Sequence, residues 1–410
     1  MTDIASARGL SEPAIAVPTP PAERARWTAV FSLSFGVFGL VTAEFLPVSL
    51  LTPIAAELGV SNGTAGQAIT ATAVVAAVAG PLLVLGSGRL DRRLIVWVLM
   101  ALLVVSGILS ARASSVFELL LARGLLGFAL GGFWAMMTAL ALRLVPPADV
   151  PRAISIIIMG VSAATVCAAP LGAALGELWG WRATFLAASG LGAVALLVQL
   201  AALPSLPATA APSLSAFGAA LSHRGILIGL GTVILVVSGH FAGLTFIRPF
   251  LEEVPRLDAA TVSLALLAFG VGGFAGNVAG GAVAARSPAL AAGSAAVLVT
   301  AAALALILFG PVAEFAFAAT ALWGFAFGAF PVSVSIWNAR AAPELAESSG
   351  ALLSSSFQVA IASGAMIGGL LIDGLGPTGV IVYAALAVVA GAGVMLVLGR
   401  AAERRRAAAA

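Results

Sequence analysis

The sequence predicts an all-α membrane protein whose twelve transmembrane helices form two pseudo-symmetric six-helix bundles. Composition is the first observation: of 410 residues, 61% are hydrophobic and only 9% are charged, whereas soluble domains carry about 25% charged residues. The second is a series of twelve apolar runs, each long enough to cross a bilayer, which takes about 20 residues. The third is a set of residues that recurs in both halves of the chain.

The apolar runs set the order of the helices. They cover roughly residues 28–50, 65–86, 94–111, 116–144, 153–176, 182–203, 225–250, 259–283, 287–310, 312–340, 349–371 and 378–400. The main break, Leu203–Ser215, is rich in Pro and Ser and is typical of a linker. We therefore expect an N-terminal segment (1–27), a first bundle (28–203), a linker (204–224), a second bundle (225–400) and a tail (401–410). The first 26 residues lack an apolar stretch that ends in a cleavage site, so no cleavable signal peptide is expected.

Arginine placement predicts the orientation of the chain. All 20 basic residues are arginines. Fifteen of them fall in segments that would share one side of the membrane, three fall in segments on the other side, and Arg123 and Arg248 lie inside runs. Because basic residues concentrate in cytoplasmic loops, both termini and the linker are expected in the cytoplasm.

An internal repeat predicts how the two bundles are related. Gly127–Phe133 matches Gly324–Phe330 at an offset of 197, and Gly180 matches Gly376 at an offset of 196. Such a parallel duplication predicts two bundles related by an axis along the membrane normal. A substrate site would then lie between them, near the midplane.

Glu44 is a carboxylate among apolar neighbours in the first run, and ionisable groups at such depth are costly and usually functional. It lies six residues before the outer boundary of its run, or ~9 Å at the helical rise. Arg123 lies seven residues into the fourth run, or ~10 Å by the same rise, so contact between the two charges is favoured. Burial opposes the charged form of Glu44 while Arg123 favours it, so its protonation can follow its surroundings. The alternative is a permanent structural ion pair.

Two further ionisable side chains lie in the seventh run. His240 is close to the midplane, and an imidazole that titrates near neutral pH suits a proton relay or a substrate hydrogen bond; a packing role is an equal alternative. Arg248, near the end of the run, is expected to be interfacial or paired with Glu252, with gating as the alternative. Glu252 itself is expected to be solvated in an outer loop.

Candidate substrate-binding residues are aromatic, amide and hydroxyl side chains within the runs. Aromatic faces can stack on a planar ring, and amides offer paired donors and acceptors. The candidates are Thr42, Phe133, Trp134, Asn277, Phe330, Trp337, Asn338 and Gln358, with Thr70 and Ser238 as weaker ones.

Several classes of function find no support. The chain has no Gly-x-x-x-x-Gly-Lys-Ser/Thr sequence for ATP phosphates. Two histidines and a single cysteine leave no metal-hydrolase cluster, so no metal site and no cofactor are expected. The arginines are accounted for by topology, so no nucleic-acid partner is expected, and we predict that the protein is not an enzyme.

Three motifs resemble those of the major facilitator superfamily. Leu119–Gly131 resembles its arginine-bearing helix 4 motif. Gly160–Gly176 resembles its antiporter motif, with Ala-Pro where Gly-Pro is usual. Ser87–Arg93 is a shortened form of its loop after helix 2, without the later glycine and basic residues. The resemblance extends over nearly the whole chain. It implies the major facilitator fold, and gating roles for Asp91, Arg92, Pro170 and Gly172.

The antiporter motif points to export by the drug:proton antiporter branch. Scattered matches, among them Glu44–Ala55, Gly176–Arg182 and Ile247–Pro249, further resemble bacterial purine ribonucleoside efflux pumps. The resemblance implies a proton-coupled antiporter in the bacterial inner membrane that exports purine ribonucleosides such as inosine. Its expected partners are substrate, protons and the lipid bilayer, and it is expected to be a monomer. Sugar efflux, multidrug efflux and a non-transporting membrane sensor are the alternatives.

In the expected mechanism, Glu44, Arg123 and His240 handle the proton. Facing outward, Glu44 takes a proton and releases its hold on Arg123 or on substrate. Facing inward, Glu44 loses the proton to the cytoplasm, and the site accepts substrate.

Overall fold

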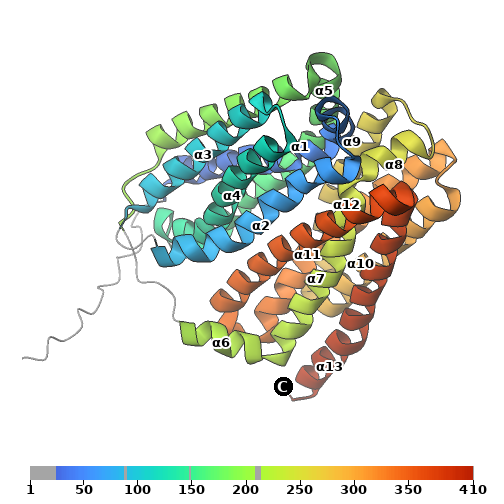
Figure 1. Ribbon diagram of the computed structural model, residues 1–410. Helices are drawn as coiled ribbons and strands as arrows, with labels where there is room; N and C mark the ends of the chain where they lie inside the picture. Colours follow the sequence, from blue (N-terminus) through green and yellow to red (C-terminus); the bar gives the residue numbers. More distant parts are fainter. Residues whose placement is uncertain (1–24, 87–89, 147–148, 208–213, 410) are drawn as a thin grey trace, which may run out of the picture.

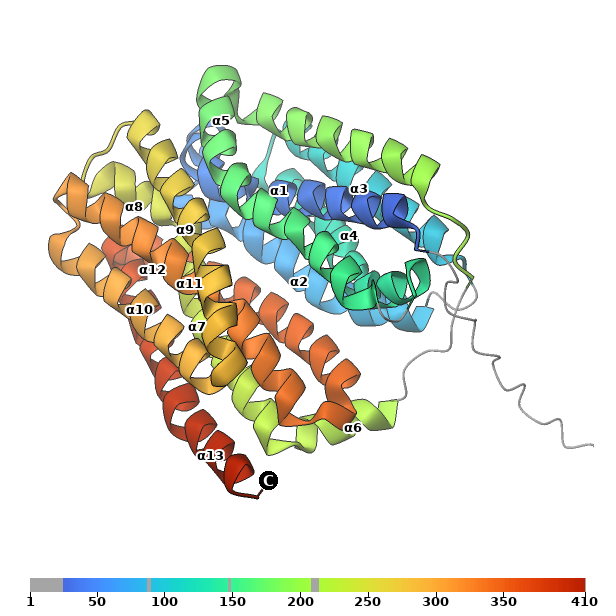
Figure 2. The same ribbon diagram turned by 180° about the vertical axis from the view of Figure 1, so that it is seen from behind.

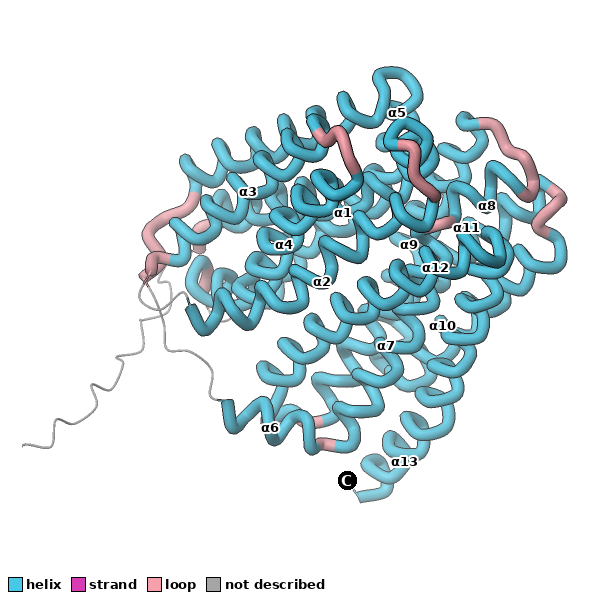
Figure 3. Tube along the Cα trace, in the orientation of Figure 1, coloured by secondary structure: helices cyan, strands magenta, loops and turns pink. Residues whose placement is uncertain are grey.

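The computed structural model describes residues 25–86, 90–146, 149–207 and 214–409. Within these ranges the chain is helical, with short turns and no strand (Figure 3). The N-terminal segment predicted at 1–27 falls almost wholly outside the described residues, as do the middle of the linker and Arg89 of the loop after the second run.

The two halves of the chain have parallel sets of helices. The first half comprises α1 (Trp27–Leu58), α2 (Asn62–Gly86), α3 (Arg92–Arg112), α4 (Val116–Leu144) and α5 (Val150–Ala202). The linker contains α6 (Leu214–Ser222). The second half comprises α7 (Arg224–Thr245), α8 (Ile247–Glu253), α9 (Ala259–Arg286), α10 (Pro288–Phe309), α11 (Ala313–Ala341) and α12 (Ala346–Gly393), followed by a π-helical stretch (Val394–Gly399) and α13 (Arg400–Ala409).

Two glycines turn long helices back on themselves. In α5, Gly180 has φ 80° and ψ 160°, and in α12, Gly376 has φ 70° and ψ 179°. Only glycine adopts such angles without strain. Among the described residues, ten helices are long and apolar enough to cross a membrane, and α5 and α12 each provide two arms. The predicted twelve crossings and the equivalence of Gly180 with Gly376 are thereby confirmed.

Small residues allow the helices of each half to pack closely. In the first half, a Cβ on Gly131 would collide with the carbonyl of Ala76, so α4 lies directly on α2. In the second half, a Cβ on Gly328 would collide with the carbonyl of Gly273, so α11 lies on α9 in the same way. These glycines are equivalent in the repeat, and the close packing they permit is typical of membrane helices.

The two halves meet at one end and diverge at the other (Figures 1 and 2). They meet where α2 packs on α12 and α5 packs on α9. A buried cluster at the junction contains Leu50 and Leu51 from the first half and Phe246 and Ile372 from the second. We call this the closed end of the interface; it holds the α1–α2 turn and α8. The ribbons diverge towards the end that holds α6.

The structure differs from the sequence expectation after α7. The predicted run 225–250 is divided at Phe246, which has φ −110° and ψ 17°, into α7 and α8. Pro249 has no N–H for the carbonyl of Thr245, so one helix cannot continue regularly. Glu252 therefore belongs to α8, where its carboxylate accepts a hydrogen bond from Arg248, and the expectation that it is solvated in a loop is wrong.

Candidate functional site

Arg123 is fully buried and binds the backbone of α1. Its Nη1 donates to the carbonyl of Ala43 at 2.8 Å, and its Nη2 donates to the carbonyl of Glu44 at 3.2 Å. The side chain is 1% exposed. Pro47 has no N–H, so the carbonyl of Ala43, four residues earlier, has no donor within the helix. Arg123 supplies that donor from α4, which places it beside Glu44 as their similar depth predicted.

Within the described part of the chain, however, the Glu44 carboxylate forms no ion pair. Among the described residues the ion pairs are Arg182–Glu57 and Arg248–Glu252. Glu44 is half-buried and lies near enough to Arg123 for their charges to interact. The Nε of Arg123 is buried and has no hydrogen-bond partner in the described part of the chain. The Arg123 cation is thus bound to the backbone of α1, keeps one unused donor, and acts on the Glu44 carboxylate through charge alone.

Next to Glu44, α1 reaches across to the second half. The rings of Phe45 and Phe241 stack with centroids 6.3 Å apart and an interplanar angle of 26°. Glu44 is therefore adjacent to a contact between the halves, where a change in their arrangement would alter its surroundings.

His240 lies inside the second half, in a cluster of aromatic rings. Its Nδ1 accepts a hydrogen bond from Trp323 Nε1 at 2.9 Å, and its ring stacks on Phe327 with an interplanar angle of 2°. It is 1% exposed. These are the contacts of a packed histidine, and its role in proton coupling stays a prediction.

The aromatic candidates for substrate binding lie mainly in the cores of their own halves. Phe133, Phe330 and Trp337 are at most 1% exposed, and Trp337 Nε1 donates to the carbonyl of Gly225 at 3.0 Å. Trp134 is half-buried. Of the four, Trp134 is therefore the one whose ring is partly accessible.

The amide and hydroxyl candidates retain unused hydrogen-bonding atoms. Both amide atoms of Asn338, Oε1 of Gln358 and Oγ1 of Thr42 are buried without a partner among the described residues. Asn277 is half-buried. Buried polar atoms are usually paired, so these groups are suited to a polar solute, and their role in binding one stays a prediction.

Asp91 joins the start of α3 to the segment that follows α5. Its carboxylate accepts hydrogen bonds from the backbone N–H of Arg93 and Leu206, both at 2.9 Å, and from Ser205 Oγ at 2.6 Å. Burial opposes ionisation, but these hydrogen bonds and the charge of Arg93 together lower the pKa of Asp91 below its usual value. The backbone N–H of Arg92 donates to the carbonyl of Leu206. These contacts therefore bind the start of the linker to the first half, and none of them reaches the second half.

The antiporter motif packs α5 against α1. Pro170 lies inside α5, and a Cβ on Gly172 would collide with the side chain of Ser49. Ser49 is thus held where the first half meets the second. The gating roles of Asp91, Arg92, Pro170 and Gly172 stay predictions.

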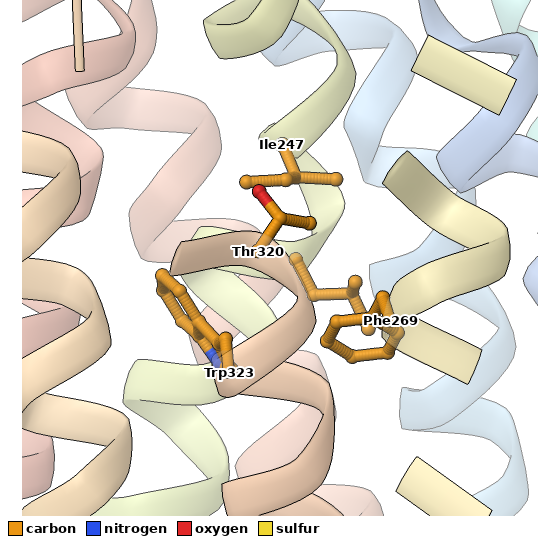
Figure 4. Close-up of a pocket in the computed structure, with 5 residues that line it drawn as sticks. Ile247, Phe269, Thr320 and Trp323 are labelled. Carbon is orange, nitrogen blue, oxygen red and sulfur yellow. The ribbon is translucent and has the colours of Figure 1, made fainter. Parts of the chain in front are cut away.

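One small pocket lies beside the aromatic cluster of the second half (Figure 4). It is lined by Leu244, Ile247, Phe269, Thr320 and Trp323 and has no room for a water molecule. This space is a packing gap and not a substrate site.

The sequence interpretation missed a polar network between the halves. Thr52 Oγ1 donates to Glu252 at 2.7 Å, and Arg248 Nη1 donates to the carbonyl of Ser49. The sequence did hold a signal for it. Pro53 leaves the carbonyl of Ser49 without a helical donor, as Pro47 does for Ala43, and a carbonyl buried in a membrane needs a partner.

Comparison with known sequences agrees with this architecture. A family model described as Major Facilitator Superfamily matches residues 33–351. The chain belongs to the major facilitator superfamily. As in that family, it is a membrane transporter and not an enzyme, which confirms both predictions.

Within the superfamily, the chain is similar to bacterial efflux pumps. It is 40% identical over 355 residues to the purine ribonucleoside efflux pump NepI of Escherichia coli O6:H1 and to that of Shigella dysenteriae serotype 1, which covers 87% of this chain and 90% of each relative. The NepI of Salmonella typhimurium is 40% identical over 353 residues, covering 86% and 89%.

Solved structures share the major facilitator fold. A bacterial homologue of the human lysosomal transporter Spinster, described as inward-facing and unoccupied, has a TM-score of 0.70 and 18% identity, covering 93% of this chain and 96% of its own. Its inward-facing, occupied form has a TM-score of 0.68 and 16% identity, covering 92% and 95%.

Proposed function

We propose that this transporter exports purine ribonucleosides, such as inosine, across the bacterial cytoplasmic membrane in exchange for protons. The observation that carries the substrate class is the 40% identity, over 355 residues, to efflux pumps named for purine ribonucleosides. Unpaired amide atoms of Asn338 and Gln358 support a solute rich in hydrogen-bonding groups. Half-buried Trp134 offers a ring for stacking on a base.

Glu44 is the proposed proton carrier. It lies on α1, which packs against helices of both halves, so a movement between the halves changes its environment. When ionised, its carboxylate has a ready donor in the unpaired Nε of Arg123. When protonated, it no longer competes for that donor. Proton uptake on the outer side and release on the inner side would then alternate with substrate release and binding.

The proposed orientation follows from the arginines. With both termini and the linker in the cytoplasm, the closed end of the interface faces outward, and the molecule is in an inward-facing conformation. Each pair of halves provides its own site, so a monomer suffices for transport.

Counterflow in proteoliposomes tests the substrate class. Vesicles loaded with unlabelled inosine should accumulate labelled inosine transiently, and adenosine and guanosine should compete. Arabinose and a cationic drug such as ethidium should not compete, because they lack the paired base edge and ribose. Uptake that only the pentose or only the drug inhibits would assign the protein to sugar or multidrug efflux instead. No counterflow of any of these solutes would contradict the transport proposal.

A further inference from the structure

Two prolines in α1 each leave a backbone carbonyl without its helical donor, and the two carbonyls find their donors in different halves. Pro47 leaves the carbonyl of Ala43 without a helical donor, and Arg123 of the same half supplies one. Pro53 does the same to the carbonyl of Ser49, but there the donor is Arg248, which belongs to α8 of the other half. The first contact can persist whatever the arrangement of the halves, whereas the second exists only while the closed end is closed.

Arg248 is held in place for this contact by a network. Its Nε donates to Glu252 Oε1 at 2.7 Å, one helical turn away. The second oxygen of Glu252 accepts a hydrogen bond from Thr52 Oγ1 at 2.7 Å. Ser49 and Thr52 both lie on α1, so α8 binds α1 at two points just before Pro53. The Arg248 side chain is 11% exposed and that of Glu252 is 23% exposed, so water screens these bonds weakly.

A second contact caps a helix from across the interface. Asp373, on the first arm of α12, accepts hydrogen bonds from Ser61 Oγ at 2.7 Å and from the backbone N–H of Gly63 at 3.1 Å. Gly63 lies in the first turn of α2, whose N–H groups have no partner within the helix. A carboxylate at a helix N-terminus is also favoured by the helix dipole. A Cβ on Gly63 would collide with the carbonyl of Gly369, so α2 and α12 approach closely there.

We propose that these two contacts form a latch that holds the closed end shut. In the first, Arg248, positioned by Glu252, binds the Ser49 carbonyl. In the second, Asp373 caps the N-terminus of α2. Opening this end breaks both contacts. The Ser49 carbonyl, which has no helical donor because of Pro53, then loses its partner, and the N-terminus of α2 loses its cap. The hydrogen bonds that are broken are charge-assisted, and such bonds are about twice as strong as neutral ones. Arg248 and Asp373 are positioning residues that set the balance between the two conformations, independently of which substrate the transporter carries.

Spin-label distance measurements test the latch in the full-length protein. Cysteines replace Leu178 and Val312, which are 74% and 45% exposed and lie near the closed end in opposite halves, in a Cys167→Ser background. Arg248→Gln and Asp373→Ala should each raise the ratio of the long-distance to the short-distance population about tenfold, in line with the loss of a hydrogen bond to a charged group.

Two matched controls separate the latch from general loss of stability. Glu57→Gln disrupts the ion pair with Arg182, which joins residues of the first half only. Asp258→Ala removes a carboxylate that caps its own helix, α9, through the N–H of Thr261. Neither should change the distance distribution. Equal distributions for Arg248→Gln, Asp373→Ala and the unsubstituted protein would overturn the proposal, as would equal shifts in the controls.

Pro53→Ala gives a second, independent test. Alanine restores the helical N–H to the Ser49 carbonyl, so the helix itself satisfies that group and Arg248 is no longer required there. Pro53→Ala alone should therefore favour the long distance, and Arg248→Gln should add less in this background than in the unsubstituted one. Strict additivity of the two substitutions would mean that the carbonyl and Arg248 are not coupled, and would contradict this arm of the latch. The measurement needs no substrate, so its outcome is separate from that of the counterflow experiment.

Discussion

At the scale of single residues, Arg123 combines a structural contact with a proposed role in proton coupling. Its hydrogen bond to the Ala43 carbonyl replaces one that Pro47 removes. Its Nε, which has no partner among the described residues, is the donor that we propose for the ionised Glu44 carboxylate. Because Nη1 makes the structural contact and Nε is the proposed donor to Glu44, the structural role and the role in proton coupling can be separated by mutation.

Arg123→Met should lower stability by about 1–3 kcal/mol, because a buried carbonyl loses its donor. Adding Pro47→Ala restores the helical hydrogen bond and should recover much of that loss. The apparent melting temperature in detergent measures both effects. Proton-coupled transport should stay absent in the double variant, because Pro47→Ala does not restore the charge. If the double variant were no more stable than Arg123→Met, the backbone role would be refuted.

Asp91 should give a pH-dependent contribution to stability. Its pKa is lowered in the folded protein, so its stabilising effect is present above the unfolded value of about 4 and is lost as pH falls through the folded value. Asp91→Ala should therefore lower the melting temperature at pH 7, at a cost typical of a lost helix cap, about 0.5–2 kcal/mol. The gap should shrink near pH 3. A gap that stays constant with pH would exclude the carboxylate as its cause.

At the scale of helices, the repeated glycines explain why α4 and α11 pack alike. A Cβ on Gly127 would collide with the Thr72 carbonyl, and one on the equivalent Gly324 would collide with the Phe269 carbonyl. Each collision involves backbone, which cannot move without shifting a whole helix.

Gly127→Ala and Gly324→Ala should therefore both destabilise the protein, by about 1–3 kcal/mol as in other overpacked cores. Gly231 is the matched control: it also lies inside a helix, but no atom of the described residues is within 4 Å of its added Cβ. There, alanine should stabilise slightly because it is the better helix former. Thermal unfolding of the three variants in detergent provides the measurement, and destabilisation by all three to the same extent would mean that helix contacts are not the reason.

Much of the helical architecture could be predicted from the sequence. Apolar length predicted the crossings, and the gaps between runs, at 177–181 and 372–377, placed both reversals, because each signal is local. The glycines matched in the repeat lie in these gaps. The break between α7 and α8 was not predicted, because apolar length alone shows no interruption at Phe246. Its sequence signal is Pro249, which removes a helical hydrogen bond. Contacts such as Asp373 with Ser61 depend on how separate helices meet, which no local pattern encodes.

The candidate site was predictable only in part. Depth counting brought Arg123 to Glu44, but it could not tell a carboxylate from a backbone carbonyl as the acceptor. Phe330 and Trp337 were predicted to face substrate from their aromatic type alone, and residue type does not reveal the direction of a side chain. Both are buried in the second half.

At the scale of the whole molecule, two halves that meet at one end suit the alternating access of the proposed mechanism. The closed end is held by contacts between the halves, and Glu44 lies beside Phe45, which contacts Phe241 of the other half. Movement between the halves would thus change the surroundings of the carboxylate and of the substrate together. In the proposed mechanism, this shared dependence on two conformations would couple the movement of protons to that of substrate.

Proton movement driven by inosine tests this coupling most directly. Proteoliposomes carry a pH-sensitive dye inside, and inosine is added outside without an imposed pH gradient. The proposal predicts that the lumen becomes alkaline as inosine enters and protons leave. It also predicts that Glu44→Gln abolishes this change while inosine counterflow continues. An unchanged internal pH during inosine entry, or the same alkalinisation in Glu44→Gln, would contradict proton coupling through Glu44.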